Sequence, residues 1–297
     1  MNAQLNPQAE SNMHVLEEIQ TMALPFDTPR FRHYPGMKLG QMVQVAFFGQ
    51  QLAALASQVL RHDNAHQRQW LITSPAYQHL PSAANLLARH VTQQLQQQGF
   101  PVELVEMRFD PAHVLIRSQE EFKRLADYSK CNVQQRIAQR QLPQPLLHSD
   151  QLAARFSDHP VLIINDINVT GTQQRFMQQM LDEFQASACH WLYIFNVEKS
   201  FAQAHPEVEN KINNSQFADQ DSYANVLADS QTQHTAICIS RLFNQEIDAF
   251  RHVLSKLPNA VCEHLHRLAL AECRYNSPLF DEKMNLLAHR PTLLHTL

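Results

Sequence analysis

Glycine is scarce in this sequence, with five among 297 residues. Sites that hold a dinucleotide or the phosphates of ATP in a glycine-rich loop need several glycines close together, because the backbone must approach the phosphate. No such run occurs here, and no lysine-bearing phosphate loop accompanies one. The sequence therefore excludes both of these site types, and each glycine that remains is more informative.

Cysteine, charge and long apolar runs are also limited. The five cysteines are an odd number without paired short spacings, which is typical of reduced thiols in a cytoplasm. A net charge of −4 gives no overall attraction to nucleic acid or to a membrane surface. No run approaches the roughly 18 apolar residues of a membrane span, and residues 1–10 lack the pattern of a signal peptide. We expect a cytoplasmic protein without a nucleic-acid or membrane partner.

Histidine, by contrast, is abundant, with seventeen residues that invite a search for a metal site. The densest group contains Cys262, His264, His266 and Cys273. On a helix that rises about 1.5 Å per residue, Cys273 lies about 16 Å from Cys262, too far for one ion to bind both. We therefore expect no metal site built from protein side chains.

One stretch, residues 161–184, organises the chain. It begins with an apolar, β-branched run that is typical of a buried parallel strand. The run ends in Asn165 and Asp166, and a short turn with Thr170, Gly171 and Thr172 leads into a helical pattern. In α/β proteins the free N–H groups at such a helix start bind phosphate. The stretch therefore predicts a phosphate site, with Asp166 placed to accept hydrogen bonds from sugar hydroxyls.

This stretch resembles the 5-phosphoribosyl pyrophosphate (PRPP) motif of the type I phosphoribosyltransferases, in which an apolar strand, two acidic residues and a Thr-Gly turn follow one another. In that family the acids bind the ribose hydroxyls and the turn binds the 5′-phosphate. The resemblance makes Asp166 the second acid and a candidate catalytic residue. The substrate-binding residues that it implies here are Asn165, Asp166, Asn168, Val169, Thr170, Gly171, Thr172 and Gln173.

Two positions depart from the family pattern, and a third bears on one subgroup of the family. Asn165 stands where the first acid is expected, and Gln173 where a second threonine is common. Val169 occupies the place where some purine-specific members carry an acidic base, which argues against that subgroup. An ordinary strand-to-helix turn in an unrelated α/β protein stays open as an alternative, because short motifs also match by chance.

Residues 69–74 are the first predicted core strand. In the family that this sequence resembles, the loop after this strand holds pyrophosphate. Family members use small residues and glycine there, whereas this loop has none of the five glycines. The residues that take the place of the pyrophosphate loop are Thr73, Ser74, Pro75, Ala76 and Tyr77. Hydroxyl and N–H donors remain available in such a loop, but the backbone approaches a ligand less closely.

Lys38 precedes the first long helix in a Lys-x-Gly element. A similar element in some phosphoribosyltransferases brings a lysine to the pyrophosphate, which makes Lys38 a candidate substrate-binding residue. A solvated loop lysine is the alternative.

An insertion, residues 109–159, lies where the family carries a mobile hood over PRPP. Helical patterns cover 119–130 and 133–141 within it. Lys130, Arg136 and Arg140 supply cations suited to a leaving pyrophosphate, and we name Lys130 and Arg136 as candidate catalytic residues. A solvated basic helix face is the alternative, because Arg136 and Arg140 are four residues apart.

The order of apolar patterns predicts the fold class. Strand patterns at 69–74, 102–108, 161–165 and 190–197 alternate with helical patterns, and the helix over 82–98 has Ser82 as its N-cap and Gly99 just past its end. We predict an α/β fold like that of the type I phosphoribosyltransferases, with a doubly wound, mostly parallel sheet and helical N- and C-terminal additions.

The remaining segments complete this organisation. We expect a short helix around 13–22, a long helix over 41–60, a polar surface excursion over 200–233, a short strand at 235–240 and two C-terminal helices separated near Pro258. The predicted parts are an N-terminal lead segment (1–37), the α/β domain (38–240) and a C-terminal helical cap (241–297).

The activity that the resemblance implies is Mg²⁺-dependent transfer of the 5-phosphoribosyl group from PRPP to a nitrogen acceptor, with release of pyrophosphate. The Mg²⁺ would be bound through PRPP, the acceptor is not identified, and a homodimer is left open. The alternative is a non-catalytic PRPP- or nucleotide-binding protein with a regulatory or interaction role. Asn165 and the glycine-free loop motivate that alternative.

Overall fold

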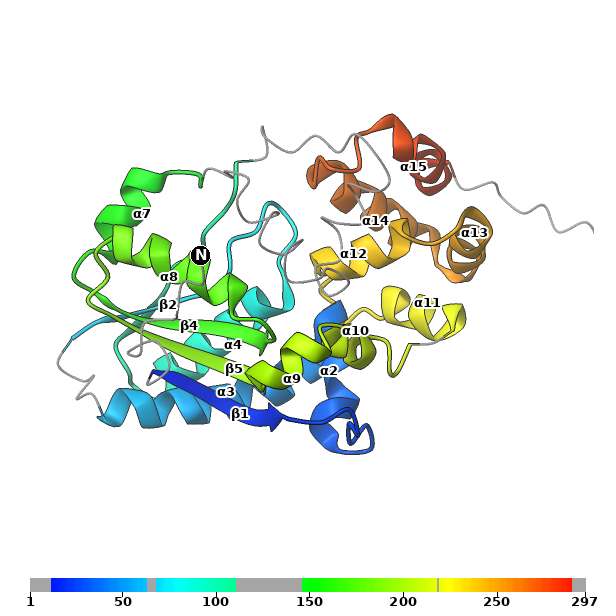
Figure 1. Cartoon of the computed structure of the whole chain (residues 1–297). Helices are drawn as coiled ribbons and strands as arrows, with labels where there is room; N and C mark the ends of the chain where they lie inside the picture. The colour runs from blue at the N-terminus through cyan, green and yellow to red at the C-terminus, as the bar shows by residue number, and fades with distance from the viewer. Residues whose placement is uncertain (1–11, 63–67, 111–145, 218, 290–297) are drawn as a thin grey trace, which may run out of the picture.

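A computed structural model describes residues 12–62, 68–110, 146–217 and 219–289 (Figure 1). In this part of the chain the centre is a sheet of five parallel strands in the order β1-β5-β4-β2-β3. The strands are β1 (Met13–Ile19), β2 (Trp70–Thr73), β3 (Val102–Leu104), β4 (Pro160–Asn168) and β5 (Ala188–Val197). The predicted α/β fold class, with its doubly wound parallel sheet, is confirmed.

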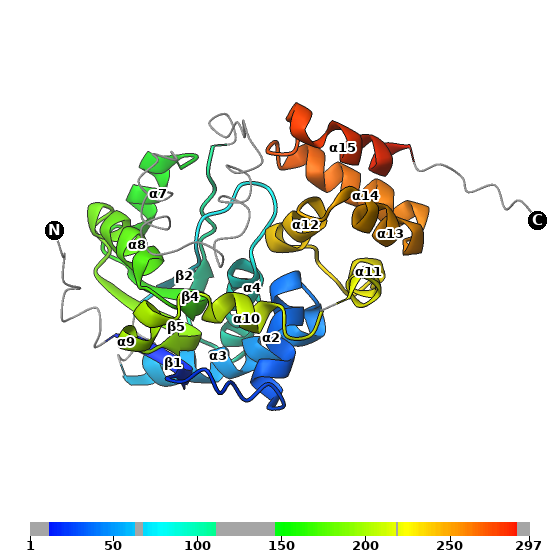
Figure 2. The ribbon, with the colours of Figure 1, turned by 45° about the vertical axis from the view of Figure 1, so that its right-hand side comes forward.

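Both faces of the sheet are covered by helices, which explains the nearly continuous apolar sequence of its central strands. Leu162 and Ile164 of β4 belong to one apolar cluster, and Val161 and Ile163 belong to another, because successive side chains of a strand point to opposite faces. Figures 1 and 2 show α3 and α4 on the first face and α7 and α8 on the second. These helices are α3 (Met42–His62), α4 (Ala83–Gln97), α7 (Ser149–Phe156) and α8 (Thr172–Glu183).

Helix α3 is long and apolar, as predicted. Gly49 does not interrupt it; a Cβ there would lie 2.3 Å from the ring of His90, so glycine allows α3 and α4 to approach closely. By length and composition alone α3 would also suffice to cross a membrane, although it contains no unbroken apolar run of that length. In the structure its buried side, with Val45, Phe48 and Leu52, packs in the core.

Helix α4 begins and ends where its sequence predicts. Ser82 is the N-cap, and its side chain and that of Asn85 form a reciprocal capping box. Gly99 follows the helix with φ of 83°, a left-handed conformation that glycine adopts without strain. This helix packs on β2, β3 and β4, and its start therefore fixes the loop that follows β2.

Two expectations for strands and helices near the sheet are wrong. The segment expected as a helix around 13–22 forms edge strand β1, which pairs with β5 from Met13 opposite Trp191 to Ile19 opposite Val197. Pairing with an apolar neighbour decides the structure of this short segment over its local preference. Strand β3 ends at Leu104 rather than at 108, although Arg108 still makes an isolated bridge to Tyr77.

The segment 200–233 is not a polar surface excursion. It contains the helices α9 (Lys199–Ala204), α10 (Val208–Asn213) and α11 (Gln220–Ala228), which bury Val208, Ile212 and Tyr223 among other residues. The predicted strand at 235–240 is wrong as well, because it forms helix α12 (Ala236–Phe243), whose N-cap Thr235 accepts a hydrogen bond from the backbone N–H of Cys238. Short apolar runs do not distinguish a strand from a buried helix by periodicity.

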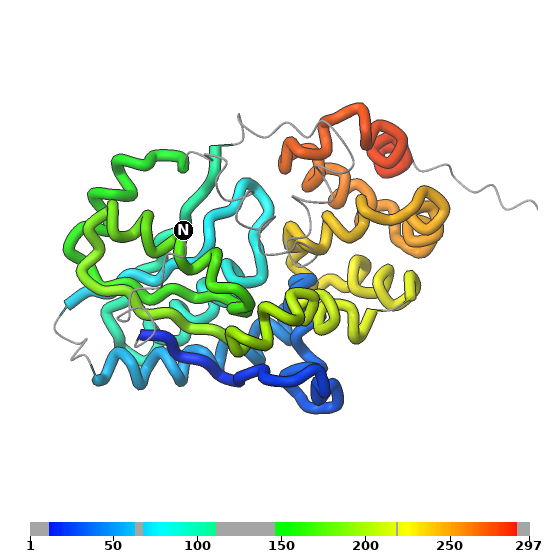
Figure 3. The backbone as a smooth tube through the Cα atoms, in the orientation of Figure 1, coloured from blue at the N-terminus to red at the C-terminus, as the bar shows by residue number. Residues whose placement is uncertain are grey.

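The C-terminal part is helical, as predicted, with Pro258 separating two of its helices. These are α13 (Ile247–Lys256) and α14 (Asn259–Ala271), and a third, α15 (Asp281–Ala288), follows them. Helices α11 to α15 share one apolar cluster, which Leu39 and Leu80 join from the α/β part. Figure 3 shows these helices gathered beside the sheet. The domain boundaries at 37 and 240 stay predictions.

Candidate functional site

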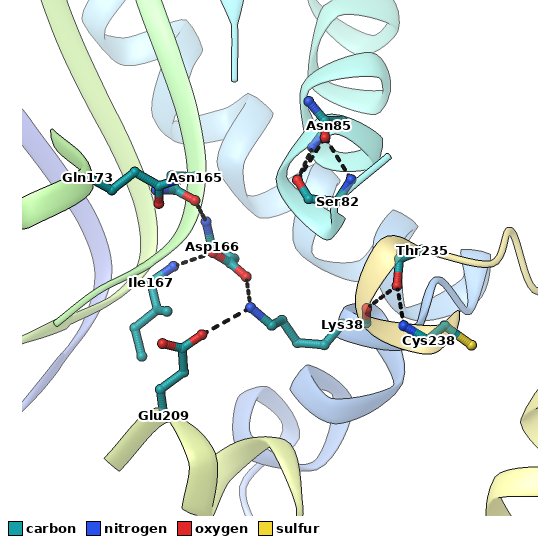
Figure 4. Close-up of polar contacts among 10 residues, drawn as sticks. All are labelled: Lys38, Ser82, Asn85, Asn165, Asp166, Ile167, Gln173, Glu209, Thr235 and Cys238. Carbon is teal, nitrogen blue, oxygen red and sulfur yellow. Dashed lines mark hydrogen bonds and ion pairs between the residues drawn. The ribbon is translucent and has the colours of Figure 1, made fainter. Parts of the chain in front are cut away.

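Asn165 and Asp166 lie inside β4 rather than after it, and their side chains point to opposite faces of the sheet. Asn165 donates from Nδ2 to Gln173 Oε1 at 3.0 Å, on the face that α8 covers. Asp166 points to the other face, toward Lys38 (Figure 4). The two residues therefore do not form a side-by-side pair that could clasp one diol, and Asp166 is the acid of this motif.

Lys38 is the partner of Asp166. It lies near the end of α2 (Pro29–Leu39) and is 6% exposed, which rules out the alternative of a solvated loop lysine. Its Nζ lies 2.5 Å from Asp166 Oδ2 and 3.1 Å from Glu209 Oε1 of α10. Burial alone lowers the pKa of Lys38, but the two carboxylates outweigh it, so that the pKa is raised and the ammonium stays charged.

Tyr34, one turn before Lys38 on α2, completes this buried cluster. The centroid of its ring lies 5.8 Å from Lys38 Nζ, and the side chain is fully buried. Burial raises the pKa of the Tyr34 phenol, and the negative charges of Asp166 and Glu209 raise it further, so the phenol stays neutral. The cluster therefore combines one ammonium with two carboxylates.

Sequence reasoning missed Glu209 and Tyr34. Nothing marks Glu209 in sequence, because it lies in a segment rich in polar residues, between Val208 and the rest of α10. Tyr34 could have been found through its spacing of four residues from Lys38, which places both on one face of a helix.

Both oxygens of Asp166 are engaged. Oδ1 accepts from the backbone N–H of Ile167 at 2.9 Å, and Oδ2 accepts from Lys38. The side chain is 10% exposed. A sugar hydroxyl that binds here has to share an oxygen that already accepts a hydrogen bond, or displace the ammonium.

The turn between β4 and α8 carries a left-handed glycine between two threonines. Gly171 is the N-cap of α8 with φ of 67°, a left-handed conformation. The hydroxyls of Thr170 and Thr172 lie 2.9 Å apart. The first intrahelical bond runs from Arg175 N to Gly171 O, so the N–H groups before it make no bond within the helix. That of Thr172 donates instead to Thr170 Oγ1 at 3.4 Å.

Other contacts hold this turn in place. Asn168 Oδ1 accepts from the backbone N–H of Gly171 at 3.0 Å, and Asn168 Nδ2 donates to Asn196 Oδ1 of β5 at 2.8 Å. Val169 is buried in the core that faces α3 and α4. Asn168 and Val169 therefore shape the turn, and their side chains are directed at the protein.

Arg175 is a site candidate that sequence reasoning passed over. Its Nη2 donates to Thr172 Oγ1 at 3.3 Å, which places a guanidinium beside the hydroxyls of the turn. Among the described residues no carboxylate forms an ion pair with it. The sequence signal was its place three residues after Thr172, in the first turn of the helix.

The loop after β2 uses its polar groups within the protein. Thr73 Oγ1 donates to Val105 O at 2.7 Å, and Ser74 Oγ accepts from Asn85 Nδ2 at 2.7 Å. The Tyr77 hydroxyl accepts from Arg89 at 3.0 Å, and Arg108 stacks over the Tyr77 ring.

Two further residues of this loop were named as candidates. Pro75 O accepts from Asn85 at 3.0 Å, and Ala76 packs on the apolar cluster of α7 and α8. Lys130, Arg136 and Arg140 lie outside the described residues.

A cleft of about 470 Å³ lies elsewhere, between the loop before α4, the segment 230–234 and α14. None of the site residues predicted from the sequence lines it. Near its wall, Glu272 Oε2 accepts from the backbone N–H groups of His79 at 3.2 Å and Leu80 at 2.8 Å. Glu272 lies at the end of α14 and is 1% exposed. Its two hydrogen bonds join the C-terminal helices to the loop that follows β2.

The resemblance implies a Mg²⁺ ion, and the carboxylates nearest to the end of β4 are those of Asp166 and Glu209. Asp166 and Glu209 share the Lys38 ammonium, which lies between the carboxylates. Across the described residues no group of three or more His, Cys, Asp or Glu side chains could hold an ion. Both carboxylates already pair with a cation, so a Mg²⁺ ion that binds to them has to replace the ammonium.

Comparison with known proteins adds one finding. The family model described as PRTase ComF-like matches residues 9–287, a span that takes in the sheet and the C-terminal helices. No curated protein matches the sequence.

Proposed function

Because the chain belongs to the ComF-like phosphoribosyltransferase family, we propose that it binds PRPP where β4 ends and α8 begins. The observation that carries this proposal is the turn from Thr170 to Thr172, which combines a left-handed glycine, two hydroxyls and the open end of a helix. Arg175 adds a positive charge beside the same hydroxyls. A 5′-phosphate accepts hydrogen bonds from hydroxyls, from N–H groups at a helix start and from a guanidinium.

The other parts of PRPP follow from this placement. The ribose hydroxyls reach Asp166, which lies on the strand that leads into the turn. The pyrophosphate lies toward Lys38 and the loop Thr73 to Tyr77. Lys130 and Arg136, outside the described residues, stay candidate cations for it. Magnesium arrives with the pyrophosphate, because the nearest protein carboxylates already share an ammonium.

The reaction that we propose is transfer of the 5-phosphoribosyl group to a nitrogen acceptor with release of pyrophosphate. Its transition state is oxocarbenium-like, so the protein accelerates it by holding the reactants in place and by stabilising the leaving group. Lys38 and the insertion cations supply positive charge for that purpose. We place this activity in the cytoplasm, in keeping with the free thiols of the described cysteines.

A non-catalytic PRPP- or nucleotide-binding role is the second candidate, and specific contacts favour it. Both oxygens of Asp166 are engaged, Asn165 faces α8, and the hydroxyls of Thr73 and Ser74 hydrogen bond within the protein. A site with fewer free groups around the pyrophosphate stabilises a leaving group less well.

Two measurements separate these candidates. Calorimetric titration with PRPP and Mg²⁺ tests binding, and the Asp166→Asn variant tests whether binding uses this site. Pyrophosphate release in the presence of a panel of nitrogen bases tests catalysis. Binding without release supports the regulatory role, and absence of binding contradicts both.

A further inference from the structure

Glu209 is a buried carboxylate that has no role in the proposed binding of PRPP. It lies on α10, is 6% exposed, and its Oε1 is 3.1 Å from Lys38 Nζ. Among the described residues, Lys38 is the cation that pairs with Glu209. Burying a carboxylate costs free energy unless a cation compensates for it, so its presence beside Lys38 calls for a reason beyond packing.

We propose that Glu209 is a positioning residue of the ribose site, acting through Lys38. It holds the ammonium from a second direction and thereby leaves Asp166 Oδ2 able to accept a hydroxyl of the ribose (Figure 4). This rests on the proposed binding of PRPP at Asp166. Glu209 itself does not touch the ligand.

The number of hydrogen-bond donors on Lys38 supports this role. An ammonium has three N–H donors; Asp166 and Glu209 take two, and no acceptor among the described residues takes the third. One positive charge shared between two carboxylates neutralises neither completely. Asp166 therefore remains a strong acceptor, and the third N–H remains available to an oxygen of the ligand.

Without the charge of Glu209, Lys38 pairs with Asp166 alone. In a buried setting of low dielectric constant that single pair is strong, and separating it for an incoming hydroxyl costs more free energy. Binding of the ribose is then weakened although neither Asp166 nor the phosphate turn has changed.

The backbone at Lys38 is fixed independently of Glu209. Lys38 O accepts from Thr235 Oγ1 at 2.7 Å (Figure 4). Gly40, with φ of 95°, packs so closely on the segment before α12 that a Cβ would lie 1.9 Å from Gln233 O. A change at Glu209 therefore alters the position of the ammonium and leaves the end of α2 in place.

The test is a double-mutant cycle read by calorimetric titration with PRPP and Mg²⁺. Glu209→Gln is expected to weaken binding by about ten-fold, within the usual range of coupling between sites. In a Lys38→Met background the same change is expected not to weaken binding, because the ammonium through which Glu209 acts is gone. An equal loss in both backgrounds, or wild-type affinity in Glu209→Gln, overturns the proposal.

Two further variants sharpen the result. Glu209→Asp keeps the charge and is expected to bind PRPP more tightly than Glu209→Gln, whereas a purely steric role predicts the reverse. Glu207→Gln, an exposed change two residues away, is the matched control and is expected to bind like the wild type.

The titrations distinguish failure of the proposed function from failure of the proposed role of Glu209. If the wild type does not bind PRPP, the function and this inference both fall; if it binds and Glu209→Gln binds equally well, the inference alone falls. If Glu209→Gln is too unstable to titrate, Lys38→Met and the double variant, both of which lack the ammonium, still decide. Weaker binding by the double variant than by Lys38→Met contradicts action through Lys38.

Discussion

Lys38 Nζ lies 2.5 Å from Asp166 Oδ2, although 128 residues separate the two in sequence. The contact joins the end of α2 to the strand that carries the PRPP motif. Lys38 also accepts a hydrogen bond from Thr235 through its backbone carbonyl, which joins α2 to the start of α12. One residue thus links the motif strand to the C-terminal helices, and this link has consequences for stability as well as for binding.

Replacing Lys38 by methionine is expected to lower the free energy of unfolding by about 3–5 kcal/mol, the cost of leaving buried charges without their partner. Methionine keeps the length and apolar stem of lysine, so the loss reports the charge. Urea unfolding measures it. Lys211→Met is the control, because that lysine is half exposed on α10 and its ion pair spans 3.8 Å. Equal losses in the two variants would contradict the account.

The same variant has a defined dependence on pH. The pKa of Lys38 is raised in the folded protein, so its stabilising effect is fully present below the unfolded pKa of about 10.4 and disappears only above it. Between about pH 5 and pH 8 the wild type therefore keeps the full contribution.

The gap in unfolding free energy between wild type and Lys38→Met should therefore narrow as the pH rises above about 10.4, where the unfolded wild type begins to lose the ammonium. Urea unfolding of both proteins from about pH 8 upward measures this gap. A gap that closes well below that pH would contradict a charged Lys38 in the folded protein.

Arg175→Gln is expected to weaken binding of phosphate-bearing ligands by about ten-fold or more, because a hydrogen bond to a charged group contributes about 1.5–3 kcal/mol. Titration with ribose 5-phosphate and with ribose isolates this effect, since only the first ligand carries the phosphate. Arg155→Gln is the matched control, an exposed arginine of α7 that pairs with Glu103. Loss of affinity for ribose as well would point to a general disturbance of the turn.

Glu272→Gln is expected to loosen the loop before α4. The carboxylate accepts from the backbone N–H groups of His79 and Leu80, and such charge-assisted bonds contribute about 1.5–3 kcal/mol. Hydrogen exchange at these two amides should become faster, while Glu282→Gln, an exposed change on α15, should leave them protected. Unchanged exchange in Glu272→Gln would show that other contacts hold the loop.

The sequence predicted those elements whose signals are local. Strand β4 is an unbroken apolar run, Ser82 and Gly99 mark the ends of α4, and Gly171 marks the turn before α8. At the helix ends and in the turn, a single residue type satisfies what the local backbone conformation requires. The order of these elements was sufficient for the fold class.

The parts that the sequence did not predict depend on distant partners. Strand β1 exists because β5 offers it an edge, and the stretch after Thr235 forms a helix because the C-terminal cluster buries one side of it. Glu209 meets Lys38 only in the folded chain, and no periodicity marks such a contact. Position in the motif likewise suggested that Asn165 and Asp166 act together, whereas alternation along the strand separates them.

The central claim is that the end of β4 binds PRPP through Asp166 and the turn that follows. Calorimetric titration with PRPP and Mg²⁺, of the wild type beside Asp166→Asn and the exposed control Asp150→Asn, tests it most directly. The account predicts saturable binding to the wild type and to Asp150→Asn, weakened by about ten-fold or more in Asp166→Asn, because a carboxylate accepts from hydroxyls more strongly than an amide does. Equal affinity in all three proteins, or no binding to the wild type, would contradict it.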